Sequence, residues 1–499
     1  MVSIMLRLSV VLTLVASAPG QVEAAKVTPV DPNLAAREQV YYRMQTLVVP
    51  WTVTLEASSL VELPDGRVAI GTRRGDVFLA TGLDEDPPRP KYQLFASGLH
   101  EVFGLAEKNG ALYATQQCEV TRLVDENGDG RADLFETVSD AWGFGGEHEF
   151  TYGSIFDRDG NLWVAHCLTG SYTSKHPFRG WAQRITTDGR SIPTCSGLRS
   201  PGGVGINAAG DVFYTENQGP WNGACGLKHL KPQGFMGHPI SFPWYDRAPG
   251  MGPRPEVPRG GRDYRQHEEA KRVPQLVPPA VVFPYKKMGQ SASAIMLDVS
   301  QGRFGPFANQ LFVGDYTLSL VMRVWLEKVG EVYQGACFPF RQGFATGVIG
   351  LAVTRQGHLI TGGCSRGWPT RGTKPYSLQR LSWTGKAPLE VQEMRIMPDG
   401  FQLLFTRAVD RKVASDPASY RMTTYTYRYQ KTYGSPEVDH SKPTITSARL
   451  AEDGRTVRLS VDGLRIGHVH ELHLDGVRSP DGERLLHPVA YYTLNALPR

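Results

Sequence analysis

The chain repeats one short pattern, two β-prone runs joined by a turn that contains glycine. The clearest copy is the segment 202–216, GGVGINAAGDVFYTE, with Val, Ile, Phe and Tyr on either side of the turn at Gly210. Such a pattern predicts a β-hairpin. Equivalent turns are centred on Gly66, Gly110, Gly160 and Gly357. From Gly66 to Gly210 the turn glycines are spaced by 44, 50 and 50 residues, which is about the length of one four-stranded blade of a β-propeller.

The interval between Gly210 and Gly357 leaves room for one more repeat and an insertion. Residues 303–328 supply that repeat, with FANQLFVGD in place of the glycine turn. Six repeats predict an all-β ring, a six-bladed β-propeller over residues 51–385. The insertion, residues 220–284, is crowded with Pro, Gly and charged residues, so we expect an irregular excursion rather than a seventh blade.

The turns change in character after residue 388. PDG at 398–400, EDG at 452–454 and PDG at 480–482 separate short strand-like runs such as FQLLF and TVRLSV. This spacing predicts a separate β-sandwich over residues 388–499, and the segment resembles bacterial immunoglobulin-like modules.

The first 24 residues have the features of a secretory signal peptide. Arg7 precedes an apolar run, residues 8–16, and small residues end at Ala24. The run is too short to cross a bilayer, which takes about 20 apolar residues. We therefore expect an exported protein, periplasmic or extracellular, without a transmembrane span. Its six cysteines favour disulfides in that compartment, with inert buried thiols as the alternative.

The net charge of +5 is spread over the chain without a basic cluster. Nucleic-acid binding normally requires a basic patch or stripe, often with interleaved aromatic residues. The sequence therefore excludes a nucleic acid as partner.

One segment has the oxygen-ligand spacing of a calcium loop. Residues 125–136, DENGDGRADLFE, place oxygen ligands at positions 1, 3, 5, 7, 9 and 12 and a glycine at position 6, as calcium requires. The predicted ligands are Asp125, Asn127, Asp129, the Arg131 carbonyl, Asp133 and Glu136. The flanking residues are strand-like, so we expect a structural calcium loop within a blade, with a metal-free turn as the alternative.

Polar residues also gather at the predicted strand ends of the third and fourth repeats. Glu147, His148 and Glu149 precede the third hairpin, while Arg199 and Glu216 flank the fourth. Strand ends and their loops surround the mouth of a propeller's central channel, where ligands bind. We expect these residues to line one site, with His148 as a general base and Arg199 as an anion or quinone ligand. A solvated polar corner is the alternative.

The segment 197–219, GLRSPGGVGINAAGDVFYTENQG, resembles the signature of soluble pyrroloquinoline-quinone-dependent sugar dehydrogenases of the glucose and sorbosone type. Over residues 51–499 the chain is more similar to exported bacterial propellers labelled membrane-bound dehydrogenases, through FGPFANQLFVGD, VYQGACFPF and SRGW. The resemblance implies a periplasmic sugar or polyol dehydrogenase that transfers hydride to a bound quinone. Electrons would leave through a separate cytochrome c or another carrier, because no C-x-x-C-H run for haem is present.

The resemblance also implies roles for individual residues. The catalytic residues would be His148, Arg199 and Glu216; the quinone would be held by Arg199, Ser200 and Arg366; the substrate would contact Asn217 and Trp221. Further candidates for stacking on a sugar ring are Trp142, Trp181 and Trp368.

Several positions depart from the dehydrogenase pattern. Ser200 replaces an asparagine, and Asp315 or Tyr316 falls where the family has a lysine. The expected arginine pair reads Ala345-Thr-Gly347-Val. A quinone with three carboxylates requires cations, so the alternative function is a non-redox propeller that binds or cleaves carbohydrate, as a lyase or hydrolase.

The two functions predict different side chains at the mouth of the channel. A quinone site requires Arg199 and Arg366 to face a positively charged mouth, with His148 within about 10 Å of Arg199. A lyase or hydrolase instead requires Glu147, Glu149 or Glu216 to face an open groove.

Overall fold

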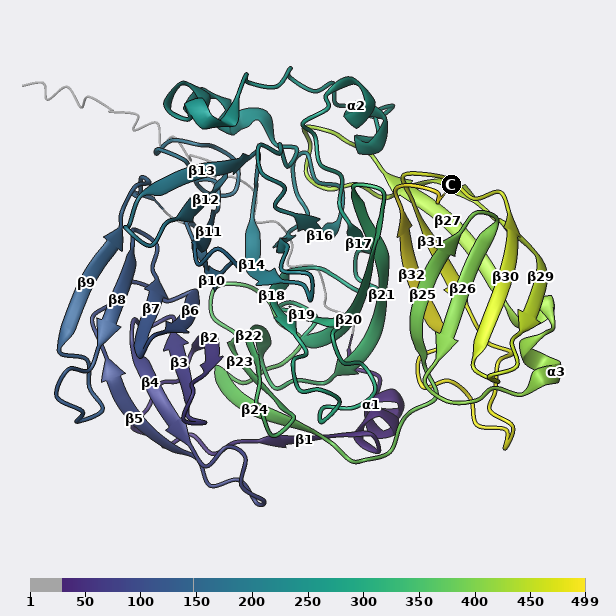
Figure 1. Ribbon diagram of the computed structural model, residues 1–499, viewed down its shortest axis with the longest axis horizontal. Helices are drawn as coiled ribbons and strands as arrows, with labels where there is room; N and C mark the ends of the chain where they lie inside the picture. Colours follow the sequence, from purple (N-terminus) through teal and green to yellow (C-terminus); the bar gives the residue numbers. More distant parts are fainter. Residues whose placement is uncertain (1–28, 147, 499) are drawn as a thin grey trace, which may run out of the picture.

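The computed structural model describes residues 29–146 and 148–498, so the predicted signal peptide and Glu147 lie outside the described part. Within it the chain is nearly all β. Figure 1 shows a ring of sheets, a second β domain beside it, and an irregular segment that carries α2 (Gln266–Arg272).

The first four sheets of the ring each have four consecutive strands in the same antiparallel order. The first sheet comprises β2 (Ala57–Glu62), β3 (Val68–Thr72), β4 (Val77–Thr81) and β5 (Lys91–Ala96). The second comprises β6 (Gly104–Lys108), β7 (Ala111–Thr115), β8 (Val120–Val124) and β9 (Leu134–Ser139). The third comprises β10 (Thr151–Phe156), β11 (Leu162–His166), β12 (Trp181–Ile185) and β13 (Ser191–Ser196).

The later sheets follow the same order but recruit distant segments. The fourth comprises β14 (Pro201–Ile206), β15 (Val212–Glu216), β16 (Cys225–His229) and β17 (Val281–Phe283). The fifth begins with β18 (Ala292–Leu297), β19 (Leu311–Asp315), β20 (Leu320–Val329) and β21 (Val332–Gln342). The last comprises β22 (Gly347–Val353), β23 (His358–Cys364), β24 (Tyr376–Trp383) and β1 (Tyr42–Thr46).

The innermost strands close a circle. Contacts run in the cycle β2, β6, β10, β14, β18, β22 and back to β2. Glycines permit this close approach: a Cβ on Gly104 of β6 would collide with the backbone of Gly153 in β10. This arrangement is consistent with a β-propeller, as the turn spacing predicts.

The N-terminal boundary predicted for the ring is wrong. The ring was expected to begin at residue 51, yet β1 pairs with β24, from Tyr42 opposite Trp383 to Thr46 opposite Gln379. The first strand in the chain is therefore the outermost strand of the last sheet. Pairing β1 with β24 joins the two ends of the ring, so opening the ring requires breaking a full strand ladder.

The insertion is shorter than predicted. Its expected bounds, 220–284, include β16 and β17, which complete the fourth sheet. The irregular part lies between them and contains η1 (Pro239–Arg247), η2 (Pro249–Met251) and α2. Its buried Phe235 and Tyr245 pack in one cluster with Trp181 of β12, so this segment is a packed cover on the third and fourth sheets.

The C-terminal domain has two packed sheets. One contains β25 (Val391–Met397), β26 (Gly400–Phe405), β30 (Thr456–Asp462) and β29 (Thr444–Leu450). The other contains β32 (Val489–Leu494), β31 (His468–His473), β27 (Arg421–Tyr427) and β28 (Glu437–Ser441). Short helices α3 (Arg411–Ala414) and η3 (Pro417–Ser419) connect them.

This domain is not separate from the ring, contrary to the prediction. β32 pairs with β21, from Gly335 opposite Thr493 to Cys337 opposite Tyr491. The fifth sheet of the ring and one sheet of the second domain are thus a single eight-stranded sheet. The helix α1 (Pro32–Gln39) lies at the same junction (Figure 1).

All six cysteines are free thiols in the structure. Five are buried and Cys118 is half-buried. Burial raises the pKa of Cys167 and of Cys225 to about 12. The structure supports the inert-thiol alternative over the predicted disulfides.

Within residues 29–146 and 148–498, no helix is both long and apolar enough to span a bilayer.

Candidate active site

The fold places the predicted site residues on one face. In each sheet the start of the first strand lies opposite the end of the second, as in Thr151 opposite His166 and Pro201 opposite Glu216. The loops before the first strand and after the second therefore share an edge. The predicted site residues therefore lie on the side of the ring where we expect the mouth of the channel.

Glu216 is a structural residue in this geometry. Its carboxylate is buried and accepts hydrogen bonds from the backbone N–H groups of Arg199 (3.1 Å) and Ser200 (2.7 Å) and from the Tyr214 hydroxyl (2.8 Å). Asp315 occupies the same position in the fifth sheet and accepts from the N–H groups of Gln290 and Ser291. Both acids tie the incoming loop to the end of the second strand, so Glu216 does not face a groove.

Arg199 is buried, and its guanidinium is held by backbone oxygens. Nε donates to Ser171 O (3.2 Å), and Nη1 donates to Gln218 O (2.6 Å). The Tyr172 and Tyr433 rings lie on the guanidinium, with centroids 5.8 Å and 5.2 Å from its carbon. The Arg199 guanidinium thus lies against two aromatic rings on the side of the ring where the sequence predicts the mouth.

Arg366 forms ion pairs with two glutamates, one before the first sheet and one before the second. Its Nε lies 2.9 Å from a Glu56 carboxylate oxygen and its Nη2 lies 3.5 Å from Glu101. Glu101 also pairs with Arg73 at 3.1 Å. The cations of this part of the mouth are therefore neutralised by carboxylates of the chain itself.

His148 is exposed and has a left-handed backbone, with φ of 56°. Its ring meets Phe150 edge-on at 5.7 Å between centroids, and Phe150 in turn lies beneath the Arg73 guanidinium at 5.8 Å. His148 makes no hydrogen bond to any residue in the described part of the chain. Within residues 29–146 and 148–498, no hydrogen bond orients this imidazole for proton transfer.

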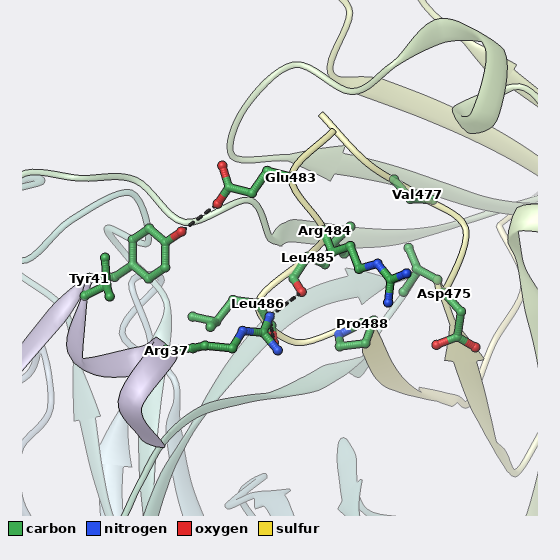
Figure 2. A pocket seen from close by; sticks show the side chains of 11 residues that line it. Arg37, Tyr41, Asp475, Val477, Glu483, Arg484, Leu485, Leu486 and Pro488 are labelled. Carbon is green, nitrogen blue, oxygen red and sulfur yellow. Dashed lines mark hydrogen bonds between the residues drawn. The ribbon is translucent and has the colours of Figure 1, made fainter. Parts of the chain in front are cut away.

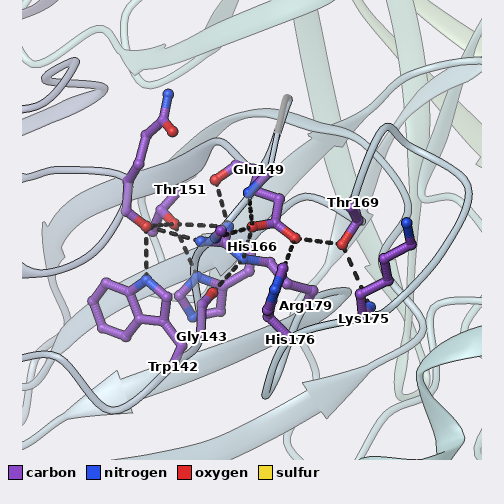
Figure 3. Close-up of polar contacts among 12 residues, drawn as sticks. Trp142, Gly143, Glu149, Thr151, His166, Thr169, Lys175, His176 and Arg179 are labelled. Carbon is purple, nitrogen blue, oxygen red and sulfur yellow. Dashed lines mark hydrogen bonds and ion pairs between the residues drawn. The ribbon is translucent and has the colours of Figure 1, made fainter.

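A second histidine is oriented by a buried carboxylate (Figure 3). The fully buried Glu149 accepts from Nδ1 of His176 at 2.7 Å, from the Thr169 hydroxyl, and from the N–H groups of Gly145 (2.8 Å) and Gly146 (3.1 Å). Burial alone would raise the pKa of Glu149, but these hydrogen bonds and the nearby Arg179 lower it. Glu149 is therefore ionised at neutral pH.

This contact fixes the tautomer of His176. An ionised carboxylate only accepts, so in the neutral imidazole Nδ1 carries the hydrogen and Nε2 presents a lone pair. The His176 side chain is 33% exposed, and Nε2 bonds to no other described residue. Gly145 keeps the space beside it open, because a Cβ there would lie 2.8 Å from Nε2. A histidine held in this way can act as a general base.

Arg179 holds the loop that carries Glu149. Fully buried, it donates through Nε to Gly143 O (2.7 Å), through Nη1 to Glu149 O (2.5 Å) and through Nη2 to Gln117 O (2.9 Å). Burial lowers its pKa to about 10 despite Glu149 nearby. His166, also buried there, bonds to Thr151 and Gln183, and burial keeps its pKa well below the ordinary value.

The predicted substrate residues differ in exposure. Asn217 is half-buried at the mouth, and its backbone oxygen accepts from Asn222. Trp221 is 5% exposed and packs on Tyr429, so it offers no ring face to a sugar. Trp142 and Trp181 are buried as well, and Trp368 is 57% exposed.

The predicted calcium loop is the connection between β8 and β9. Asp125 accepts from the N–H groups of Gly128 and Gly130, and Asp133 accepts from those of Glu126 and Asn127. Glu136 lies on β9 and pairs with Arg122 at 2.9 Å. In the described residues no group of three or more His, Cys, Asp or Glu side chains has a metal-binding arrangement.

A separate cleft of about 440 Å³ lies between α1 and the loop of residues 474–488 (Figure 2). Arg37 in it donates to Leu485 O at 3.0 Å, and the Tyr41 hydroxyl donates to Glu483 at 2.6 Å. None of the predicted site residues lines this cleft. Its polar groups join the N-terminal helix to the second domain.

The model of the family described as a domain of unknown function, DUF7133, matches residues 59–339, more than half of the chain. This chain belongs to the DUF7133 family. The match spans β3 to β20 completely and so contains Arg199, His176 and Glu149. A search of the curated proteins finds no match.

Several solved structures match this DUF7133 chain at low identity. The PQQ-bound aldose sugar dehydrogenase from Streptomyces coelicolor is 14% identical over 68% of this chain and 98% of its own, with a TM-score of 0.44. The PQQ domain of pyranose dehydrogenase from Coprinopsis cinerea is 12% identical over 68% and 97%, with a TM-score of 0.46. A gluconolactonase from Xanthomonas campestris is 12% identical over 74% and 99%, with a TM-score of 0.40.

The sequence interpretation of this DUF7133 chain missed His176. The residue lies in SYTSKHPFRG, between β11 and β12, with no motif around it. The signal that could have found it is the combination of Glu149 before the first strand of the third sheet and a histidine in the loop after the second strand of that sheet. That signal is visible only once both loops are known to share a face.

Proposed function

We propose that this protein is an exported carbohydrate-acting propeller, in which the mouth binds a sugar or polyol and His176 takes a proton from it. The observation that supports this proposal most directly is the 2.7 Å hydrogen bond between Nδ1 of His176 and Glu149, which leaves Nε2 directed away from the carboxylate. Supporting it are exposed aromatic rings on the same face, among them Tyr172 and Trp368, because such rings stack on sugars.

Oxidation of the sugar or polyol is the first form of this chemistry. Hydroxyl deprotonation begins such an oxidation, and a bound pyrroloquinoline quinone would supply the hydride acceptor. The residues that would hold it, Arg199, Ser200 and Arg366, do not fit a tricarboxylate: Arg366 is already paired with Glu56 and Glu101. No step can therefore be derived through this quinone, nor through a cytochrome partner.

The second candidate is non-redox chemistry on carbohydrate, as a lyase or hydrolase. What favours it is the same pairing of Arg366 and Arg73 with Glu56 and Glu101, which removes two of the cations that a tricarboxylate would need. Proton abstraction by His176 suits either candidate.

One assay separates the candidates. The purified protein is incubated with a panel of aldoses, polyols, uronates and oligosaccharides, with and without added quinone and calcium. Oxidation predicts reduction of an electron-accepting dye, whereas cleavage predicts new reducing ends or unsaturated products without dye reduction. The absence of every product across the panel would overturn the proposed function.

Three finer structural assignments belong to the same proposal. Six blades are supported by the cycle of innermost strands, and an immunoglobulin-like second domain by its two packed sheets. Calcium binding would use Asp125, Asn127, Asp129, Asp133 and the Arg131 carbonyl, which lie in one nine-residue loop. Glu136 would join only by leaving Arg122.

A further inference from the structure

The second domain contributes a residue to the channel mouth. Tyr433 lies in the loop between β27 and β28, and that loop is bonded to the loop of the fourth sheet after β15. Trp221 N donates to Gln430 O (2.7 Å), Gly434 N to Gly219 O (3.1 Å) and Ser435 N to Gly223 O (3.0 Å). These backbone bonds hold the Tyr433 ring over Arg199, 5.2 Å from the guanidinium carbon.

Tyr172 from the third sheet also contacts Arg199, with its ring centroid 5.8 Å from the guanidinium carbon. Both tyrosines remain 54% exposed, although large apolar side chains are mostly buried elsewhere in the fold. Two half-exposed rings next to one guanidinium present ring surface to solvent. Aromatic surface of this kind binds the C–H face of a pyranose ring.

Arg199 differs from Arg73, Arg179 and Arg366 in its ion pairing. Those three arginines each lie within ion-pair distance of a carboxylate. The side chain of Arg199 donates to backbone oxygens instead, and within residues 29–146 and 148–498 no carboxylate pairs with it. Its Nη2 makes no hydrogen bond to a described residue and remains in contact with solvent. A positive charge without a partner is best matched by an anionic ligand.

We infer that Tyr172, Arg199 and Tyr433 form a subsite for an acidic sugar, a uronate whose ring stacks on tyrosine and whose carboxylate meets Arg199. This inference deepens the proposed function, on which it rests for the carbohydrate class. It also assigns the second domain a role: its Tyr433 completes a site that the ring alone leaves open.

The test is calorimetric titration of the whole protein with D-glucuronate and with D-glucose. Glucuronate should bind at least tenfold more tightly, and that preference should shrink as salt is raised, because exposed charge interactions are screened. Tyr433→Ala and Tyr172→Ala should each weaken glucuronate binding about tenfold, since a stacked ring contributes on the order of 1 kcal/mol. Tyr433→Phe should retain it.

Phe135→Ala is the matched control, because Phe135 is an exposed aromatic residue on the outer strand β9. It should leave binding unchanged. Arg199→Lys tests the charge, and the tyrosine variants remain informative if that variant fails to fold. Equal affinity for the two sugars, no binding of glucuronate, or indifference to both tyrosine substitutions would overturn the subsite.

The subsite and the proposed function fail in different ways. Tyrosine-dependent binding of glucuronate without turnover of any sugar leaves the subsite standing and defeats the catalytic proposal. Turnover that is unaffected by Tyr433→Ala and Tyr172→Ala, together with unaffected binding, defeats the subsite alone.

Discussion

At the scale of residues, hydrogen-bond partners separate reactive groups from structural ones. Glu216 and Glu149 are both buried acids at the mouth, yet Glu216 accepts from backbone N–H groups and a tyrosine, while Glu149 also accepts from a histidine. The first contact set fixes a turn. The second fixes a tautomer, which is what a general base requires.

Gly145→Ala tests whether the space beside His176 is used. The backbone of Gly145 does not require glycine, but the new Cβ would lie 2.8 Å from Nε2 and displace the imidazole. We expect kcat to fall at least tenfold with little change in Tm. Gly146→Ala is the control, because its Cβ would meet Thr169 at 3.3 Å and not the imidazole. Equal activity in both variants would show that Nε2 needs no open space.

At the scale of elements, the loop between β8 and β9 is the segment through which calcium would stabilise the fold. A calcium ion that binds only the folded protein stabilises it by about 2.7 kcal/mol at a hundredfold excess over Kd. Tm should therefore rise with free calcium and fall with chelator, and Asp125→Ala should abolish the difference. Asp188→Ala, in an exposed turn of the third sheet, should keep it. A Tm that is indifferent to calcium would make the loop a metal-free turn.

The joint between α1, the ring and the second domain is a buried ionic cluster. His487 lies 3.0 Å from Glu38 and 2.6 Å from Glu390, and Glu38 also pairs with Arg341 at 2.7 Å. Burial alone would lower the pKa of His487, but Glu390 and Glu38 raise it to about 9. Protonated His487 therefore stabilises the fold.

Because the pKa of His487 is raised in the folded protein, the free energy of unfolding should fall as pH rises. The contribution is complete below about pH 6.5, the ordinary pKa of histidine, and is lost as pH rises to about 9. We expect up to about 3 kcal/mol of unfolding free energy to disappear over that interval. His487→Gln should flatten the decline in Tm between pH 6.5 and 9, whereas His440→Gln, at an exposed position, should preserve it. A wild-type Tm that is constant over this range would contradict the assignment.

At the scale of the whole molecule, the sequence predicts what local spacing controls. The turn glycines at 66, 110, 160 and 210 have positive φ, as their hairpins require, and their spacing indicates the ring. The pairing of β1 with β24, and of β21 with β32, joins segments more than 150 residues apart. No local pattern encodes such pairing, so the sequence misplaced the start of the ring and did not predict the sheet shared with the second domain.

For the candidate site too, the sequence predicts what local spacing controls and misses what long-range contacts decide. That Arg199 and Glu149 share one face could be predicted, because strand ends of consecutive hairpins meet there. Which histidine is oriented depends on a contact between Glu149 and His176, 27 residues apart. The stack on Arg199 depends on Tyr433, which reaches the mouth only because the second domain shares a sheet with the ring.

The central claim is that the proton acceptor of the mouth is His176, oriented by Glu149, rather than His148. Once a turned-over sugar is identified, the direct measurement is kcat for His176→Asn and His148→Asn at equal protein folding. We predict a loss of at least about a hundredfold for His176→Asn, the usual contribution of a general base, and less than a threefold change for His148→Asn. The reverse result, with His148→Asn inactive and His176→Asn active, would contradict the claim.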